Sequence, residues 1–192
     1  MSREPLPLRF LGDPVLRRKA EAIPEVTLEI RDLIEALFAT MYFEEGVGLA
    51  APQVGRSVRL FVIDVEPEEE GGARVKQAFV NPVIRERSGE MVGEEGCLSI
   101  PGLRADVKRA ARVVMEALDA DGKPFRIEAE GIVARALQHE LDHLDGIVFL
   151  DRLGPITRRL LEAKWKRVRP DVESDRASRS TDDGASGAAP SR

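Results

Sequence analysis

The sequence predicts an α+β fold, and three observations lead to that class. Strand-like segments recur between residues 58 and 130, and the last two flank Asp119-Ala120-Asp121-Gly122, a hairpin turn signal. An apolar run from Ile132 to Leu144 with helical character follows them, and a second helical pattern begins at Pro155. Strands that come first, with helices packed against them, are typical of the α+β class.

The N-terminal quarter of the chain is expected to hold an irregular arm and one packing helix. Residues 1–26 are interrupted by prolines, and Asp13 before Pro14 suits a short helical turn with proline in its first turn. After Thr27 the apolar residues recur with helical spacing, which predicts a helix. Gly46 is expected to end that helix.

The predicted strands are short runs of β-branched and aromatic residues bounded by turn residues. Asn81-Pro82 is expected to separate two of these runs, and residues 66–72 form an exposed acidic hairpin loop. The predicted ranges are Val58–Val65, Gln77–Asn81, Val83–Arg87, Arg112–Leu118, Pro124–Glu130 and Ile147–Leu150.

The last predicted helix runs from Pro155 to about Arg169 and has two unlike faces. One face is apolar; the other carries six basic residues against the single acid Glu162. Its apolar positions are Ile156, Leu160, Leu161, Trp165 and Val168. Residues 170–192 have almost nothing to bury, so we expect a disordered tail behind a catalytic domain that spans residues 1–169.

Charge and cysteine content favour a cytoplasmic protein. A net charge of −5 and a pI near 5.3 argue against general binding to DNA or to anionic membranes. No apolar run is long enough for a membrane span, and no N-terminal signal is visible. The single cysteine, Cys97, excludes an intramolecular disulfide and fits a reducing compartment.

The segment Gln138–His143 contains the only two histidines of the sequence, four residues apart. On an α-helix that spacing places both imidazoles on one face, where both can bind one divalent metal ion. Glu140 is well placed to hold a water molecule beside that ion. A metal lowers the pKa of a bound water from about 15.7 to about 7, and the carboxylate can carry its proton. The pattern indicates metal-assisted hydrolysis; two histidines on a helix surface are the competing interpretation.

A catalytic metal normally has three protein ligands, so one more is needed. No third histidine exists, and the only soft donor is Cys97, in a polar turn flanked by Gly96. A buried, inert cysteine is the alternative.

The Gly-rich segment 46–55 predicts a tight loop that another chain can approach closely, and it lacks the spacing of a phosphate-binding loop. Gln53 within it reads, on these grounds alone, as a loop-bracing residue.

Three segments together resemble the signature motifs of the peptide deformylase family, in the family's order and spacing: Gly46–Gln53, Glu95–Ser99 and Gln138–His143. The similarity extends over most of residues 1–169. It implies the deformylase fold, with antiparallel or mixed sheets wrapped around a central metal-binding helix. It also implies removal of the N-formyl group from the initiator methionine of nascent bacterial or organellar proteins, with release of formate.

The resemblance assigns roles to residues of this sequence. It implies Cys97, His139 and His143 as metal ligands and Glu140 as general base. The oxyanion is expected to be stabilised by Gln53 and by the backbone N–H of Leu98. The remaining substrate-binding positions are Val47, Ile132 and Ala136 in the methionine pocket, the Gly48 backbone, and Arg104 near the peptide groove.

Arg135 departs from the family pattern. It stands where an apolar pocket residue is expected, so the pocket rim is predicted to be more polar or more open. The implied cofactor is one divalent metal per chain, with Fe(II) as the physiological ion and Zn(II), Ni(II) or Co(II) as possible replacements. The implied partners are N-formyl-Met nascent peptides and, through the basic C-terminal helix, the ribosome.

Two other functions compete with this interpretation. An H-E-x-x-H endopeptidase would cleave internal peptide bonds and leave a formyl group in place. A structural metal module would merely bind a ribosome or RNA through its basic helix. The sequence has no fourth cysteine or histidine to close such a structural site, which counts against the module.

Overall fold

The computed structural model describes residues 4–66 and 73–182, with side chains described as far as residue 174. The chain divides into two compact units, residues 1–152 and 153–192, and each is described by itself. In the first unit a five-stranded sheet has the order β1-β2-β3-β6-β7, and β4 and β5 form a separate pair. All the pairs are antiparallel. The strands are β1 (Gly48–Ala50), β2 (Leu60–Val65), β3 (Val75–Ser88), β4 (Met91–Gly96), β5 (Arg104–Arg109), β6 (Arg112–Leu118) and β7 (Pro124–Glu130).

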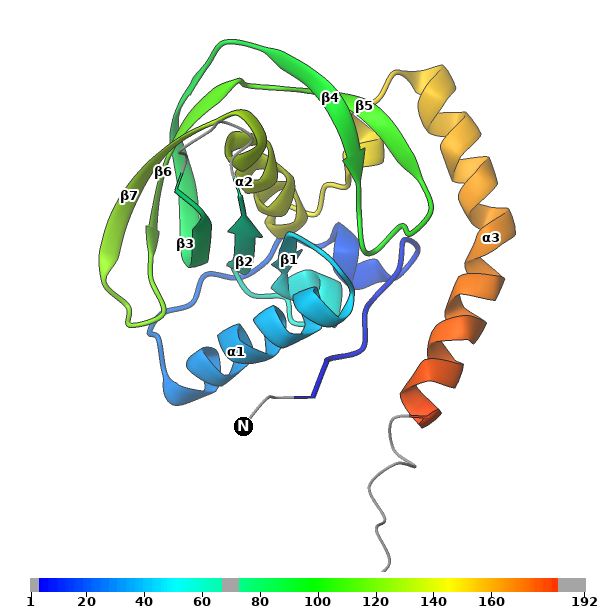
Figure 1. Ribbon diagram of the computed structural model, residues 1–192, viewed down its shortest axis with the longest axis horizontal. Coiled ribbons are helices and arrows are strands. Elements are labelled where there is room, and N and C mark those ends of the chain that lie inside the picture. The colour runs from blue at the N-terminus through cyan, green and yellow to red at the C-terminus, as the bar shows by residue number, and fades with distance from the viewer. Residues whose placement is uncertain (1–3, 67–72, 183–192) are drawn as a thin grey trace, which may run out of the picture. The chain divides into compact units, whose positions relative to one another are not determined.

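Among the described residues of this unit, the α-helices are α1 (Leu28–Phe43) and α2 (Gly131–Leu144). Figure 1 shows α2 enclosed by strands, with β3, β6 and β7 on one side and the β4–β5 pair passing over it. Three short 3-10 helices, η1 (Pro14–Arg17), η2 (Ala51–Val54) and η3 (Phe149–Arg152), complete the unit. The α+β class predicted from the sequence is confirmed.

Strand β2 lies at the centre of the core because both of its faces are buried. Phe61 and Ile63 belong to the apolar cluster that includes residues of α2, whereas Leu60 and Val62 belong to the cluster that includes residues of α1. This alternation follows the two-residue period of a strand. The sheet therefore separates two layers of core, and α2 lies in one of them.

The N-terminal elements begin as predicted, but the left-handed residue that ends α1 is Glu45 and not the predicted Gly46. Asp13 caps η1 by accepting a hydrogen bond from the Val15 N–H, with Pro14 at the first helical position. Thr27 caps α1 through the Ile30 N–H. The helix ends at Phe43, and Glu45 takes the left-handed conformation at φ 56° before Gly46 is reached.

The hairpin β6–β7 has the predicted bounds, and the Asp119 carboxylate accepts hydrogen bonds from the backbone at Asp121 and Lys123 in its turn. The predicted strand over 147–150 is wrong: Asp151 accepts a hydrogen bond from the Val148 N–H and the segment turns into η3. Strands β1, β4 and β5 were not predicted. The segment 46–55, expected to be a tight loop, contains β1 and η2 instead. The acidic loop expected at residues 66–72 lies outside the described residues except for Glu66.

The two strands predicted on either side of Asn81-Pro82 form one continuous strand, β3. Asn81 adopts a left-handed conformation at φ 52°, and the register with β6 shifts between Val80 and Val83. Asparagine tolerates this conformation better than most residues. Its side chain accepts a hydrogen bond from the Ile23 N–H at 2.8 Å and donates one to the Ile23 carbonyl at 2.7 Å. The bend is therefore tied to the N-terminal arm.

The described part of the second unit contains one long helix, α3 (Pro155–Asp182). The helix continues through Pro170 to Asp182, so the prediction of a disordered tail from residue 170 is wrong as far as Asp182, and residues 183–192 lie outside the described residues. The predicted apolar face is only partly correct, because Trp165 is buried while Ile156 and Leu160 are exposed. The division of the chain at residue 169 remains a prediction. Among the described helices, none is both long enough and apolar enough to cross a bilayer.

Candidate metal centre

Helix α2 presents both histidines on one buried face. Every residue from Val133 to Leu144 is buried, and His139 and His143 are only 9% and 1% exposed. Their ring centroids lie 5.1 Å apart in an edge-to-face arrangement. The four-residue spacing on a helix accounts for this proximity. The alternative interpretation, two histidines on a helix surface, is thus excluded.

Cys97 follows β4 and meets the two histidines. Its Sγ lies 3.3 Å from Nε2 of His143, and ligand atoms of Cys97, His139 and His143 all lie within 4.8 Å of one another. A thiolate and two imidazoles suit Zn(II) and other first-row transition metals, and three protein ligands leave a position open. These three residues therefore fit a catalytic metal ion in their number, chemistry and spacing.

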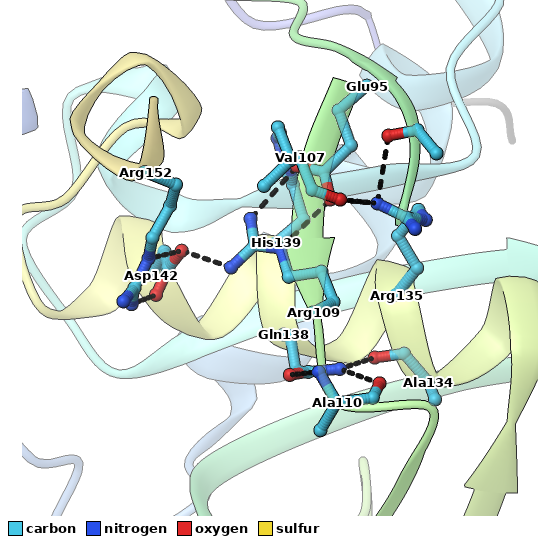
Figure 2. Close-up of polar contacts among 11 residues, drawn as sticks. Glu95, Val107, Arg109, Ala110, Ala134, Arg135, Gln138, His139, Asp142 and Arg152 are labelled. Atoms are coloured by element: carbon cyan, nitrogen blue, oxygen red, sulfur yellow. Dashed lines mark hydrogen bonds and ion pairs between the residues drawn. The ribbon is translucent and has the colours of Figure 1, made fainter. Parts of the chain in front are cut away.

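Glu95 fixes the orientation of the His139 ring. Its Oε2 lies 3.0 Å from Nδ1 of His139, which leaves the other ring nitrogen available to a metal. Arg109 donates to both oxygens of the same carboxylate at 2.9 Å, and Arg135 donates to Oε1 at 2.9 Å. Figure 2 shows these side chains converging on Glu95 between β4, β5 and α2. The hydrogen bonds from Arg109 and His139 outweigh burial and hold the pKa of Glu95 well below its ordinary range.

A second carboxylate, Asp142 on α2, extends this network. Asp142 accepts hydrogen bonds from Arg109 and from Arg152 of η3, so each acid is shared between two arginines (Figure 2). Burial works against ionisation of Arg109, but Glu95 and Asp142 raise its pKa above the ordinary value. The arginines therefore stay charged and hold the helix to β5 and η3.

The surroundings separate the pKa values of His139, Glu140 and His143 on α2. Burial lowers the pKa of His139, but hydrogen bonds to Cys97 and Glu95 outweigh it and raise that pKa well above the ordinary value. Burial and the charge of His139 lower the pKa of His143. Burial raises the pKa of Glu140 to about 7. A carboxylate with a pKa near 7 is suited to accept and return a proton at neutral pH.

Glu140 points toward the first strand of the sheet. A Cβ atom added at Gly48 would lie 2.5 Å from Oε1 of Glu140, so only glycine allows β1 to pass this close to the carboxylate. Among the described residues, Oε2 of Glu140 has no hydrogen-bond partner although it is buried. A buried oxygen without a partner is costly, and it remains available to a water molecule or a substrate group.

Gln53 is held with its amide nitrogen toward the cysteine. Its Oε1 accepts a hydrogen bond from the Ala50 N–H at 2.8 Å, and its Nε2 donates to Ser99 Oγ at 3.1 Å and lies 3.5 Å from Cys97 Sγ. The side chain is 1% exposed. Gln53 lies in η2 and braces the start of that helix through Ala50, and it also directs a donor at the metal-ligand cluster.

Comparison with known proteins decides the family. A family model described as polypeptide deformylase matches residues 5–159 of the chain. The chain belongs to the peptide deformylase family. It is an enzyme of that family, and the recognition based on its three motifs is confirmed.

Relatives and solved structures support this assignment over most of the chain. A peptide deformylase of Thermodesulfovibrio yellowstonii is 45% identical over 161 residues, which cover 84% of this chain and 96% of that protein. One from Picosynechococcus sp. is 48% identical over 150 residues, covering 78% and 79% of the two chains. The crystal structure from Legionella pneumophila has a TM-score of 0.79 and 41% identity, covering 87% of this chain and 96% of that one. The structure from Ehrlichia chaffeensis in complex with actinonin has a TM-score of 0.81 and 36% identity, covering 86% and 98%. The deformylase fold is thus confirmed.

The other predicted site residues lie on the segments around this cluster. Leu98 directly follows Cys97, and Gly48 is in the edge strand β1. Ala136 and Ile132 stand about one and two turns, respectively, before His139 on α2. Val47 is 56% exposed beside β1, and Arg104 is exposed on β5, where it pairs with Glu94.

The prediction that Arg135 makes the pocket rim more polar or more open is wrong. Its side chain is buried, and Nη1 donates to the Gly93 carbonyl, Glu95 Oε1 and the Val107 carbonyl. Its position on α2 directs the Arg135 side chain toward the β4–β5 pair, and these two strands were not predicted from the sequence. Glu95 and Arg109 were also missed as partners of the site. Glu95 lies within a quoted motif, but only the missing hairpin could have indicated its contact with His139.

Proposed function

We propose that this deformylase removes the N-formyl group from the N-terminal methionine of newly synthesised proteins and releases formate, with a divalent metal held by Cys97, His139 and His143. The observation that carries the proposal is the convergence of these three donors beside Glu140 and Gln53. When bound, the metal supplies a Lewis acid and lowers the pKa of water at the site. Every protein group needed for amide hydrolysis is then present.

Glu140 performs the proton transfers in this proposal. Its carboxylate takes a proton from the attacking water and returns it to the amine that leaves as the formyl C–N bond breaks. The Nε2 of Gln53 and the backbone N–H of Leu98 donate to the oxygen that becomes negative in the transition state. Donors placed in advance for a developing charge are among the largest contributions to catalysis.

The substrate main chain is proposed to lie along β1. That strand is at the edge of the sheet, so one row of its backbone groups is not used by β2. An extended peptide can add to such an edge through main-chain hydrogen bonds, and the Gly48 backbone is the proposed partner. The methionine side chain is assigned to Val47, Ile132 and Ala136 beside the His139 ring, with Arg104 near the groove.

Fe(II) is proposed as the physiological metal, with Zn(II), Ni(II) or Co(II) as replacements. The thiolate and imidazole donors accept each of these ions. The proposed compartment is the cytoplasm, since the substrates are nascent chains and the single cysteine leaves no intramolecular disulfide to form.

Helix α3 is proposed to contact the ribosome. Arg159, Lys166 and Arg167 are exposed, whereas Arg158 and Arg169 are paired with Glu162 and Glu173 on the same helix. Exposed cations on one helix in an acidic chain can bind RNA phosphates through a salt-dependent attraction.

One experiment separates this function from its competitors. The purified chain is incubated with a formyl-Met peptide, with and without a chelator, and formate is measured. Metal-dependent formate release with intact peptide bonds supports deformylation. Cleavage of internal bonds would support an endopeptidase, and absence of both reactions in the metal-loaded chain would overturn the proposal.

A further inference from the structure

We propose that Arg135 is a positioning residue for the metal ligands, because it ties the strand that leads to Cys97 to the helix that carries His139 and His143. The inference rests on the metal site of the proposed function. It concerns metal binding, which is measured without any peptide.

The first argument is the set of groups that Arg135 joins. From α2, its Nη1 reaches the Gly93 carbonyl at 3.1 Å, the Val107 carbonyl at 3.0 Å and Glu95 Oε1 at 2.9 Å. Gly93 and Val107 are opposite each other in the β4–β5 register. One nitrogen of the helix therefore holds both strands of the hairpin at the same level (Figure 2).

The second argument is where these contacts lie relative to the ligands. Arg135 stands one helical turn before His139, and Glu95 stands two residues before Cys97. Glu95 also contacts Nδ1 of His139. Arg135 thus acts on the spacing between the cysteine and the histidines, and, through Glu95, on the orientation of one imidazole ring.

The third argument is that stability alone does not account for this side chain. Among the described residues, Nη2 of Arg135 is buried without a hydrogen-bond partner. Burying such a group costs free energy of folding, and apolar residues of similar volume are often at least as stabilising. Arg109 already binds both oxygens of Glu95, so charge compensation does not require a second guanidinium.

The fourth argument is the space that the chain leaves for the guanidinium. A Cβ atom added at Gly93 would lie 3.0 Å from Nη2 and 3.3 Å from Cζ of Arg135. The backbone of Gly93 is not in the left-handed region, so alanine there would disturb the guanidinium rather than the strand. Gly93→Ala therefore displaces Arg135 without removing its charge.

The test measures Co(II) binding by the metal-free chain, using a competing chelator and the visible absorption of the thiolate-bound ion. Arg135→Met is expected to weaken Co(II) affinity 10–100-fold, the usual loss when a residue supporting a metal ligand is removed. The absorption spectrum should shift, and Arg135→Lys should recover part of the affinity. Gly93→Ala should weaken affinity in the same direction. Gly154→Ala, whose added methyl group meets nothing within 4 Å, is the matched control.

The proposal is overturned if Arg135→Met folds and binds Co(II) within twofold of the unaltered chain with the same spectrum. If Arg135→Met does not fold, Arg135→Lys and Gly93→Ala decide the question: affinities equal to that of the control overturn it. Formate release is a separate measurement. A chain that loses affinity as predicted but does not deformylate would refute the proposed function and leave this inference standing.

Discussion

The side-chain amide nitrogen of Gln53 lies 3.5 Å from the sulfur of Cys97. Its orientation is set by the Ala50 N–H, which binds the amide oxygen. We predict that Gln53→Ala lowers kcat for formate release by about 10²–10³, the usual effect of losing one oxyanion donor. Metal content should not change, because Gln53 is not a proposed ligand. Gln77→Ala on β3 is the control, and a kcat within threefold of normal in Gln53→Ala would contradict the role.

Glu140→Gln should retain the metal and lose nearly all turnover. The amide keeps the size of the carboxylate but cannot carry the proton, and each proton transfer is typically worth about 10²–10⁴ in rate. Metal analysis and formate release are measured on the same sample. Near-normal turnover would disprove the assignment as general base, whereas loss of metal would make Glu140 a ligand.

Fe(II) should give a more active enzyme than Zn(II), although zinc binds more tightly in the general affinity order and is expected after purification in air. Cys97, His139 and His143 would hold the ion together with a water molecule, so a substrate oxygen bound at the same time would be a fifth ligand, whereas zinc with cysteine and histidine ligands is usually four-coordinate. The stripped chain is reloaded anaerobically with Fe(II), Ni(II), Co(II) or Zn(II), and turnover is compared on one formyl-Met peptide. Equal turnover with zinc and iron would show that coordination number is not limiting.

Air should inactivate the iron-loaded enzyme, since the thiolate of Cys97 can be oxidised stepwise to sulfenic and higher acids. The nickel-loaded enzyme serves as the control and should keep its activity. Loss of activity at the same rate with both metals would point to a cause other than oxidation at the iron site.

Asp64 should make stability depend on pH. It is 8% exposed and accepts hydrogen bonds from Arg74 and from the Tyr42 hydroxyl. The Arg74 hydrogen bond outweighs burial and lowers the pKa of Asp64 below its ordinary value of 3.8. The folded-state pKa lies below the unfolded one, so the stabilisation is present above pH 3.8 and is lost as the pH falls through the folded-state pKa.

Asp64→Asn should therefore lower the free energy of unfolding by about 1–3 kcal/mol at pH 7, since it removes hydrogen bonds to a charged group. The difference from the unaltered chain should shrink when urea unfolding is repeated at pH 3. Asp106→Asn, at an exposed position of β5, is the control. A difference that is the same at both pH values would show that the ionised carboxylate is not what stabilises the fold.

Charge reversal on α3 tests the proposed ribosome contact. Replacing Arg159, Lys166 and Arg167 by glutamate should weaken co-sedimentation with ribosomes and leave turnover of a small formyl-Met peptide unchanged. The control reverses Arg85, Lys123 and Arg126, which are exposed on the first unit. Unchanged ribosome binding in the α3 variant would mean that this basic face is only solvated.

Sequence patterns predicted the elements whose signals are local. The hairpin β6–β7 has an Asp-Gly turn signal between two strand-like runs, and the metal-binding helix carries both histidines. The pair β4–β5 escaped prediction because Gly93, Glu95 and Gly96 have low strand propensity. That strand turns Glu95 inward, toward Arg109 and Arg135. Such a strand is stabilised by residues distant in sequence, so its formation depends on contacts that a local pattern does not contain.

The same reason explains the error at Arg135. An arginine within an apolar helix face normally extends its guanidinium group to solvent, because its side chain is long enough to do so. Here its Nη1 donates to three acceptors on the β4–β5 hairpin, which the sequence did not predict. The ligand cluster itself was predictable because cysteine and histidine are scarce in this chain.

The bend at Asn81 sets the position of β1 relative to α2. Strand β3 pairs with β2 up to Val80 and with β6 from there on, so the angle at residue 81 relates the half of the sheet that carries Gly48 to the half that leads into α2. Gly48 lies opposite Ile63, three residues along β2 from Leu60, or about 10 Å. A rotation of about 10° there would move Gly48 by roughly 2 Å, and a misplacement of about 1 Å can cost 10²-fold in rate. A substitution at residue 81 would thus leave every catalytic side chain in place chemically but would shift the distances between the substrate-binding strand and the groups on α2.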